Sequence, residues 1–460
     1  MKKAMFIILI IAIVTRLIFL DLRPMDHDES VHAWISLKNV VESPSYVYDP
    51  AFHGPFLYFI ISLSFMTLGD SDFAARLPIA IFSILGVYFA TRFERWFGKS
   101  AYIFSFFTLF SPSMLYYSRY ARDDVIVVSS FIAFLYFYSS YREEKKMRYA
   151  LIASIFLAII FTSKENWIQY FLVLISAIAL EKLLQKKFDF DFNILPCAAL
   201  FLFFSSFLYS SAFAYAIHAK NWVEVMFNTE WIKRFLEKSL PYWLSQGITS
   251  PHEKPIYYFV NILLRYEFLF LALALVSISF RKKFSFFEIF AICWLFVSFI
   301  FYHAMVYKTP WLVVHLAAPL AFAAMVFMKE KLEKKEVKII LSIGIVATLL
   351  ISIQITYFDY NNVEEPLIYV QTQLGAIEME KRIRELVKNN YSVAVFAEDG
   401  HFWPMPWILR REKVLFTTTC PQGYDFVFAV YRDYKCLKGY KIIGSYELRK
   451  YWIFYELRKI

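Results

Sequence analysis

The sequence predicts an α-helical membrane protein that crosses the bilayer many times and carries a small α/β domain at its C-terminus. Three observations lead to this fold class. Of 460 residues, 59% are hydrophobic and only 19% are charged, which is too little charge for a soluble chain of this length. Apolar runs of about 18–22 residues recur, each long enough to cross a ~30 Å hydrocarbon core. After about residue 358 these runs give way to short strand-like segments.

Eleven apolar segments are predicted to be transmembrane helices. They are residues 5–20, 73–91, 101–118, 125–141, 149–163, 167–180, 194–216, 256–279, 285–306, 311–328 and 337–356. The first resembles a signal peptide, but it lacks a small-residue cleavage site, so we expect it to be retained. Pro55–Leu68 is also apolar, but it is short and follows Gly54. We therefore expect a helix that lies along the membrane interface.

The loops between these segments divide into two sets by charge. The set rich in Lys and Arg comprises residues 2–3, 92–99, 142–148, 181–191, 281–283 and 329–338. The other set comprises residues 21–72, 119–124, 164–166, 217–255, 307–310 and the tail after Tyr357. Because positive loops face the cytoplasm, we expect a multi-pass plasma-membrane protein with a cytoplasmic N-terminus and an extracytoplasmic C-terminal domain. The net charge of +10 then reflects topology, and no nucleic-acid-binding motif accompanies it.

The domain division follows from this pattern: residues 1–357 form the transmembrane domain, with 21–72 as its first outer loop, and residues 358–460 form the outer domain. β-branched and aromatic content predicts strands at Leu367–Val370, Ser392–Ala397, Lys413–Phe416, Phe426–Val430 and Lys441–Ser445. Leu374–Lys388 has a helical period. This order of strands and a helix indicates a small α/β domain, and no nucleotide-binding motif occurs in it.

Two features of the outer domain allow more than one interpretation. Residues 402–407, which contain Trp403 and Trp407, form either an aromatic lip on the bilayer or ordinary core packing. Cys420 and Cys436 share a compartment that permits a disulfide, but their spacing does not establish the geometry. Cys197 and Cys293 lie in predicted spans, where we expect small core residues.

Ionisable residues that topology does not explain gather in the outer loops. They are Asp26, Asp28, Glu29, His53, Arg119, Arg122, Asp123, Asp124, Lys164, Glu165 and Lys308. Four separate loops contribute them, all at the same predicted depth. Charged groups at a membrane surface that give no packing energy indicate function, so we expect a single outward-facing site.

Asp26-His27-Asp28-Glu29 directly follows the first predicted span. Asp28 precedes an amphipathic segment, Ser30 to Val41, and is a natural N-cap. A cap needs one carboxylate, however, and three are present. A helix N-terminus keeps a nearby carboxylate ionised, as a general base or a metal ligand must be. Asp26 and Asp28 also resemble the acidic pair of oligosaccharyltransferases, and this resemblance implies a candidate site for a divalent metal ion.

The cationic residues of the outer loops suit a phosphate group. Arg119 and Arg122 favour bidentate phosphate contacts, although pairing with Asp123 and Asp124 or snorkelling to headgroups would also explain them. His53 beside Gly-Pro is an ordinary turn residue when taken alone. Lys164 and Lys308 stand in very short loops, where a Lys often snorkels. Together with the carboxylates, these residues suit a polyprenyl-phosphate sugar whose lipid tail lies in the bilayer.

The motif order resembles the pattern of lipid-phosphate-sugar glycosyltransferases of the GT-C fold, which include protein O-mannosyltransferases and the lipid A aminoarabinose transferase. The motifs are Asp28-Glu29, His53–Tyr58, Ala75–Pro78 and Arg122-Asp123. Residues 307–311 and 403–410 resemble more closely a mainly archaeal subgroup described as flippase-activity-associated in N-glycosylation. The resemblance implies that Asp28 is the catalytic base with Glu29 as its neighbour. It also places Asp123 or Asp124 at the second acidic position. His53 stands where the aminoarabinose transferases carry a Lys.

The predicted function is transfer of a sugar from a dolichyl- or polyprenyl-phosphate donor to the hydroxyl of an unknown acceptor on the outer face. The expected partners are this donor and membrane lipids, and no nucleic acid is expected. A lipid-sugar flippase is the main alternative, but such transporters usually show inverted repeats and midplane charges, which this sequence lacks. A non-catalytic partner in a glycosylation pathway is the second alternative.

Overall fold

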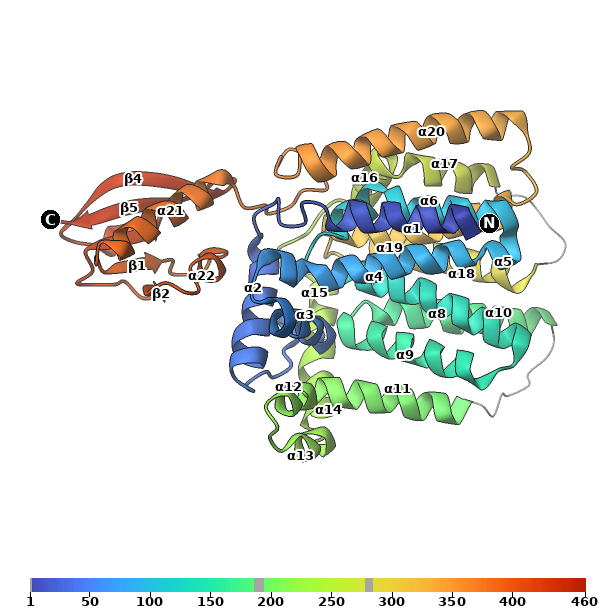
Figure 1. Ribbon diagram of the computed structural model, residues 1–460, viewed down its shortest axis with the longest axis horizontal. Coiled ribbons are helices and arrows are strands. Elements are labelled where there is room, and N and C mark those ends of the chain that lie inside the picture. Colours follow the sequence, from blue (N-terminus) through green and yellow to red (C-terminus); the bar gives the residue numbers. More distant parts are fainter. Residues whose placement is uncertain (1, 186–193, 278–283) are drawn as a thin grey trace.

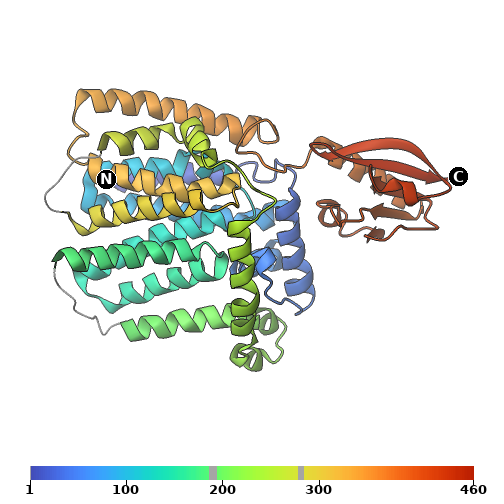
Figure 2. The same ribbon diagram turned by 180° about the vertical axis from the view of Figure 1, so that it is seen from behind.

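The computed structural model describes residues 2–185, 194–277 and 284–460, and it consists of a helical bundle followed by a small α/β domain (Figure 1). The N-terminal helix begins at one end of the bundle, and the α/β domain extends from the opposite end. The view from behind shows the same arrangement (Figure 2). The predicted basic loop 281–283, and residues 186–191 of the loop 181–191, lie outside the described residues.

The bundle helices follow the predicted apolar segments closely. They are α1 (Lys2–Leu17), α4 (Asp72–Arg92), α5 (Glu94–Phe97), α6 (Ala101–Phe110), α7 (Pro112–Tyr117), α8 (Asp124–Glu144), α9 (Met147–Ser163), α10 (Trp167–Gln185), α11 (Ile194–Tyr209), α16 (Tyr258–Tyr266), α17 (Phe268–Ser277), α18 (Phe286–Ala304), α19 (Val314–Met328) and α20 (Lys335–Ile353). Within the described ranges, six helical stretches are long and apolar enough to span a membrane, or seven if α16 and α17 count as one bent span. The total of eleven spans stays a prediction.

Two predicted spans are interrupted in the structure. The segment 101–118 breaks at Ser111, whose side chain caps α7. The segment 256–279 bends by 95° between α16 and α17. Glu267 lies at this bend, and its carboxylate accepts hydrogen bonds from Ser111 Oγ (2.7 Å) and from the backbone N–H of Ser113 (3.1 Å). The two breaks therefore face each other and share a carboxylate, which satisfies the backbone N–H of Ser113 inside the bundle.

The basic loops meet at one end of the bundle. Arg95 pairs with Glu144 at 2.8 Å, Lys99 lies 3.5 Å from Glu333, and Lys329 donates to the carbonyl of Trp96 at 3.0 Å. These contacts join the loops 92–99, 142–148 and 329–338, as the charge pattern predicts. That this end faces the cytoplasm stays a prediction.

At the opposite end, α2 (His27–Ile35) lies across the ends of the bundle helices (Figures 1 and 2). The other elements there are the π-helix Ser36–Glu42, the 3-10 helix Pro50–Phe52, α3 (Pro55–Leu68), α12 (Ala212–Ile217), α13 (Trp222–Phe227), α14 (Glu230–Arg234), the π-helix Phe235–Ser239 and α15 (Leu240–Ile248). The bounds of α3 match the predicted interfacial helix. A Cβ atom at Gly54 would lie 2.2 Å from the carbonyl oxygen of Thr162, so only glycine allows His53 to sit this close to the end of α9.

The C-terminal domain is a five-stranded sheet in the order β2-β1-β3-β5-β4, packed against α21 (Leu374–Lys388). Its strands are β1 (Val393–Phe396), β2 (Val414–Thr417), β3 (Phe426–Val430), β4 (Tyr440–Arg449) and β5 (Trp452–Lys459). β1 pairs in parallel with β2 and β3, whereas β5 pairs antiparallel with β3 and β4. The helix and four strands are confirmed. The predicted strand Leu367–Val370 is wrong, because this connector packs on the bundle, where Tyr117 Oη donates to the carbonyl of Leu367. The strand β5 was not predicted.

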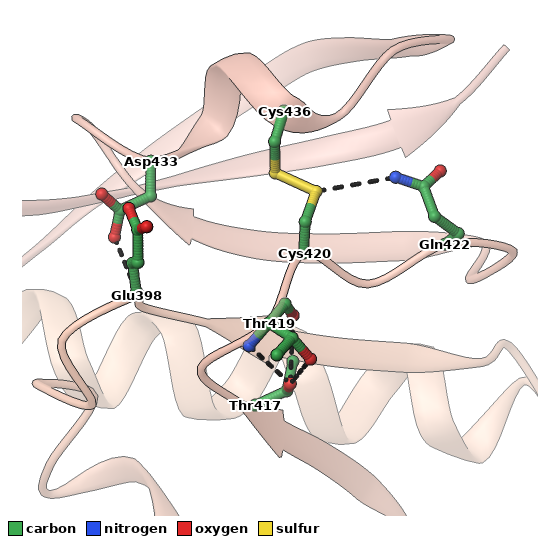
Figure 3. The surroundings of a disulfide bond; sticks show 7 residues. All are labelled: Glu398, Thr417, Thr419, Cys420, Gln422, Asp433 and Cys436. Atoms are coloured by element: carbon green, nitrogen blue, oxygen red, sulfur yellow. Dashed lines mark hydrogen bonds between the residues drawn. A yellow bond between two sulfur atoms is a disulfide. The ribbon is translucent and has the colours of Figure 1, made fainter.

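Cys420 and Cys436 form a disulfide bond (Figure 3). It joins the segment that follows β2 to the short 3-10 helix Tyr434–Cys436 between β3 and β4. The alternative that the sequence left open is therefore decided in favour of pairing.

Candidate functional site

A cavity of about 280 Å³ opens beside α2 at the end of the bundle that carries the C-terminal domain. Segments far apart in the sequence line it: α2, the turn that ends at His53, the loop before α8, α15 with the loop that follows, and the loop before α19. The lining residues are His27, Asp28, Val31, His32, Ala51, Phe52, His53, Arg122, Tyr242, Trp243, Gln246, Pro251, His252 and Tyr307. Asp28 is the only acid among them, so this cavity is the candidate active site.

Asp28 does not cap α2, which corrects the expectation from the sequence. The N-cap is Asp26, whose Oδ1 accepts a hydrogen bond from the backbone N–H of Glu29 at 2.8 Å. Glu29 Oε2 in turn accepts from the backbone N–H of Asp26 at 3.4 Å, which completes a capping box. Because Asp26 takes over the cap, the Asp28 carboxylate remains available to the cavity.

Asp28 forms an ion pair with Arg122, and 39% of its side-chain surface remains accessible. The guanidinium of Arg122 also lies over the ring of Trp311, 3.8 Å from the centroid. Burial acts to raise the pKa of Asp28, but Arg122, together with the neighbouring imidazoles, lowers it below the ordinary value for Asp. Asp28 is therefore ionised at neutral pH, as a general base must be.

Glu29, the second predicted catalytic acid, lies at the centre of a buried ion cluster instead of lining the cavity. Its carboxylate accepts from Arg23 Nη2 (2.9 Å), from Arg76 Nε (2.8 Å) and from the backbone N–H of Ala121 (2.8 Å). The side chain is fully buried. Glu29 thus connects α2 to α4 and to the loop that carries Arg122, which sets the position of the neighbouring Asp28.

Two predicted phosphate ligands are not brought into the cavity. The guanidinium of Arg119 donates to the carbonyls of Arg16 (3.0 Å) and Ile18 (2.8 Å) at the end of α1. The amino group of Lys308 donates to the carbonyl of Met305, although the adjacent residue, Tyr307, lines the cavity. Arg119 and Lys308 therefore satisfy backbone carbonyls at helix ends.

Asp124 and Lys164 form a buried pair behind the cavity. Lys164 Nζ lies 2.7 Å from Asp124 Oδ1, and His315 Nε2 lies 3.0 Å from the same oxygen. Asp123 is also buried, but neither of its carboxylate oxygens has a hydrogen-bond partner among the described residues. Burial raises the pKa of Asp123 well above its ordinary value. His315 was missed by the sequence analysis, although an ionisable residue within a predicted span is a signal for function.

Glu165 supports His53 from the loop behind it. Its Oε2 lies 3.0 Å from His53 Nδ1, and the imidazole stacks on Trp243 at 5.3 Å between centroids. Burial raises the pKa of Glu165 to about 8 and lowers the pKa of His53 well below its ordinary value. At neutral pH, a protonated Glu165 therefore donates to a neutral His53, which leaves Nε2–H of His53 as a hydrogen-bond donor.

Three further histidines line the cavity and were not predicted: His27, His32 and His252. His32 Nδ1 lies 2.9 Å from the carbonyl of Ala121, and His252 Nδ1 lies 2.9 Å from Tyr369 Oη. Burial lowers the pKa values of His27 and His32 to about 4, so both rings are neutral. The position of His27 inside the acidic motif was the available signal.

The predicted metal pair does not fit the geometry. Asp26 caps α2 and Asp28 pairs with Arg122, so the two carboxylates face different partners. Across residues 2–185, 194–277 and 284–460, no group of three or more His, Cys, Asp or Glu side chains is arranged to hold a metal ion.

Comparisons with known proteins agree with this architecture. The sequence model of the family described as dolichyl-phosphate-mannose-protein mannosyltransferase matches residues 52–210, less than half of the chain. Two crystal structures of ArnT from Cupriavidus metallidurans are similar over 99% of this chain and 98% of theirs. The structure bound to undecaprenyl phosphate gives a TM-score of 0.66 at 13% identity, and the apo structure gives 0.64 at 12%. The chain shares the fold of ArnT. A comparison with curated protein sequences gave no match.

The expected GT-C fold is thus confirmed as a fold. Assignment to the mainly archaeal flippase-activity-associated subgroup stays a prediction, because neither matching comparison tests it.

Proposed function

We propose that this chain is a membrane glycosyltransferase that uses a polyprenyl-phosphate-linked sugar, with Asp28 as the general base. The observation that carries the proposal is the Asp28–Arg122 ion pair on the wall of an accessible cavity. A match to a mannosyltransferase family over residues 52–210 and the fold shared with ArnT bound to undecaprenyl phosphate support the donor class.

The reaction needs an ionised base and a place for a departing phosphate. Asp28 removes the proton from the acceptor hydroxyl, and the resulting oxygen attacks the anomeric carbon of the sugar. The bond between that carbon and the phosphate oxygen breaks, and polyprenyl phosphate leaves with one more negative charge than it carried in the donor. The proton stays on Asp28 until the product departs. Arg122, which lies against Asp28, keeps the base ionised and faces the charge that develops on the phosphate.

The remaining site residues support these two groups. His53 donates to the donor phosphate, because Glu165 occupies its other nitrogen. Asp124 and Lys164 act from behind: Asp124 lies 3.7 Å from Arg122 Nε and holds Lys164 at 2.7 Å. Glu29 is a positioning residue rather than a catalytic one in this proposal. The transferred group is a hexosyl unit, and the site faces the outer surface.

The proposal is tested by incubating the purified chain with radiolabelled polyprenyl-phosphate sugar and a membrane extract as the acceptor source. Asp28→Asn preserves the shape of the side chain but removes the base, so we expect transfer to fall by about 100-fold or more. Asp21→Asn, which changes an exposed acid in the same loop, serves as the matched control and should leave transfer unchanged. Full activity in Asp28→Asn would remove Asp28 from the base role. Translocation of a lipid-linked sugar in liposomes, undiminished by Asp28→Asn, would instead favour a flippase.

A further inference from the structure

The C-terminal domain contacts the transmembrane domain at two places near α2. At one place, Trp407 Nε1 donates to Asp72 Oδ1 at 2.8 Å, and its ring stacks on Phe65 at 5.6 Å between centroids. At the other, Thr372 Oγ1 donates to the carbonyl of Met25 at 2.7 Å. Trp407 is thus buried against the transmembrane domain, as the core-packing interpretation of residues 402–407 expects. Docking holds the turn between β4 and β5 beside the first residue of α2.

Arg449 at this turn reaches across the domain boundary to His27. Its Nη1 lies 3.5 Å from His27 Nδ1, and its Nη2 donates to the carbonyl of His401 at 3.4 Å. Its Nε is buried and has no partner among the described residues. A guanidinium only donates hydrogen bonds, so Nδ1 of His27 has to accept. This contact favours the neutral tautomer of His27 that carries its proton on Nε2.

The opposite tautomer is set at His32, the next imidazole along α2. Its Nδ1 faces the carbonyl of Ala121 at 2.9 Å, and a carbonyl only accepts, so the proton is on Nδ1. His32 therefore offers the cavity a lone pair, whereas His27 offers an N–H group. Both rings line the same cavity. Whether each ring offers the cavity a donor or an acceptor therefore depends on the group that faces its Nδ1.

The cavity benefits from such donors because Arg122 is the only Arg or Lys among its lining residues, and Arg122 is shared with Asp28. Arg122 pairs with Asp28, Lys164 pairs with Asp124, and Lys308 donates to a backbone carbonyl. Arg449 has no carboxylate within ion-pair distance among the described residues, so its charge is available to strengthen the N–H group of His27.

We propose that the C-terminal domain completes the phosphate subsite of the cavity: Arg449 fixes the tautomer of His27, so that the imidazole presents its Nε2–H to the phosphate of the lipid-linked sugar. Arg449 is a positioning residue in this inference, which rests on the proposed function. Its positive charge behind the ring strengthens the donor as the leaving phosphate gains negative charge. The outer domain thereby acts on the reaction from across the domain boundary.

The test measures binding of tritiated undecaprenyl phosphate to the purified full-length chain in nanodiscs. Arg449→Ala removes the group that selects the Nε2–H tautomer of His27, and His27→Ala removes the hydrogen-bond donor itself. Each change is expected to weaken binding roughly 10-fold, the loss of one hydrogen bond to a charged group. Because both act through the same N–H, the double variant should bind no more weakly than His27→Ala alone. Arg432→Ala is the matched control, because Arg432 and Arg449 both lie over the Trp452 ring, at 4.5 Å and 5.3 Å from its centroid, but Arg432 pairs with Asp399.

The outcomes separate the inference from the proposed function. Wild-type affinity in Arg449→Ala, or losses that multiply in the double variant, would overturn the inference and leave the glycosyltransferase proposal standing. An equal loss in Arg432→Ala would also overturn it, because the effect would then come from general disturbance of the domain. If the wild-type chain itself failed to bind undecaprenyl phosphate, the proposed function would fall, and the inference with it.

Discussion

Replacing Glu29 with Gln tests whether the residue beside Asp28 is structural. Among the described residues, Glu29 is the only carboxylate that forms an ion pair with Arg23 or Arg76. The side chains of Glu29 and Arg76 are 0% exposed, and that of Arg23 is 7% exposed. Gln keeps the shape but leaves two buried guanidinium groups without an anion. Breaking a buried pair in this way costs about 3–5 kcal/mol. At about 2 °C per kcal/mol for a large chain, the melting temperature should fall by about 6–10 °C.

The assay is thermal unfolding in detergent, followed by tryptophan fluorescence. Glu42→Gln is the matched control, because it breaks the exposed pair with Lys38, whose side chains are 48% and 30% exposed. That change should cost at most about 0.5 kcal/mol. A wild-type melting temperature for Glu29→Gln would refute the assigned role. So would complete loss of sugar transfer at unchanged stability, since that outcome identifies a catalytic acid.

Two further predictions concern pH and domain docking. Glu165 has a pKa raised from 4.5 to about 8, so its contribution to the free energy of unfolding is full below pH 4.5 and is lost as the pH rises through 8. Glu165→Gln, which mimics the protonated acid, should flatten the fall of the melting temperature between pH 5 and about 8.5; an unchanged slope would contradict this. Arg410 pairs with Asp70 at 2.7 Å across the domain contact. Arg410→Ala should speed proteolysis of the connector 358–373 several-fold, and cleavage at the wild-type rate would argue against docking through this pair.

Patterns that act over a few residues were predictable from the sequence. The ends of α3 and α21 follow from Pro55 after a glycine and from a helical period bounded by polar residues. The meeting of Asp28 with Arg122 was also predictable, because charge placed both residues in loops at the same end of the bundle. That prediction needed only topology.

The roles of individual side chains, which depend on the partners that they contact, were not predictable from the sequence. Asp26 and Asp28 are both good N-caps by residue type, and only the position of Glu29 three residues after Asp26 decides between them. The roles of Glu29 and Arg119 depend on partners 47 and about 100 residues away. The tautomer of His27 depends on a residue of another domain, 422 positions later. No local pattern carries that information.

The most direct test of the catalytic assignment is an experimental structure of the chain with polyprenyl phosphate bound. We expect the phosphorus atom in the cavity beside α2, within hydrogen-bond reach of Arg122 and of the imidazoles of His27 and His53, with Asp28 on the adjacent wall. A phosphate bound outside this cavity would contradict the assignment of Asp28 and Arg122 to the reacting site.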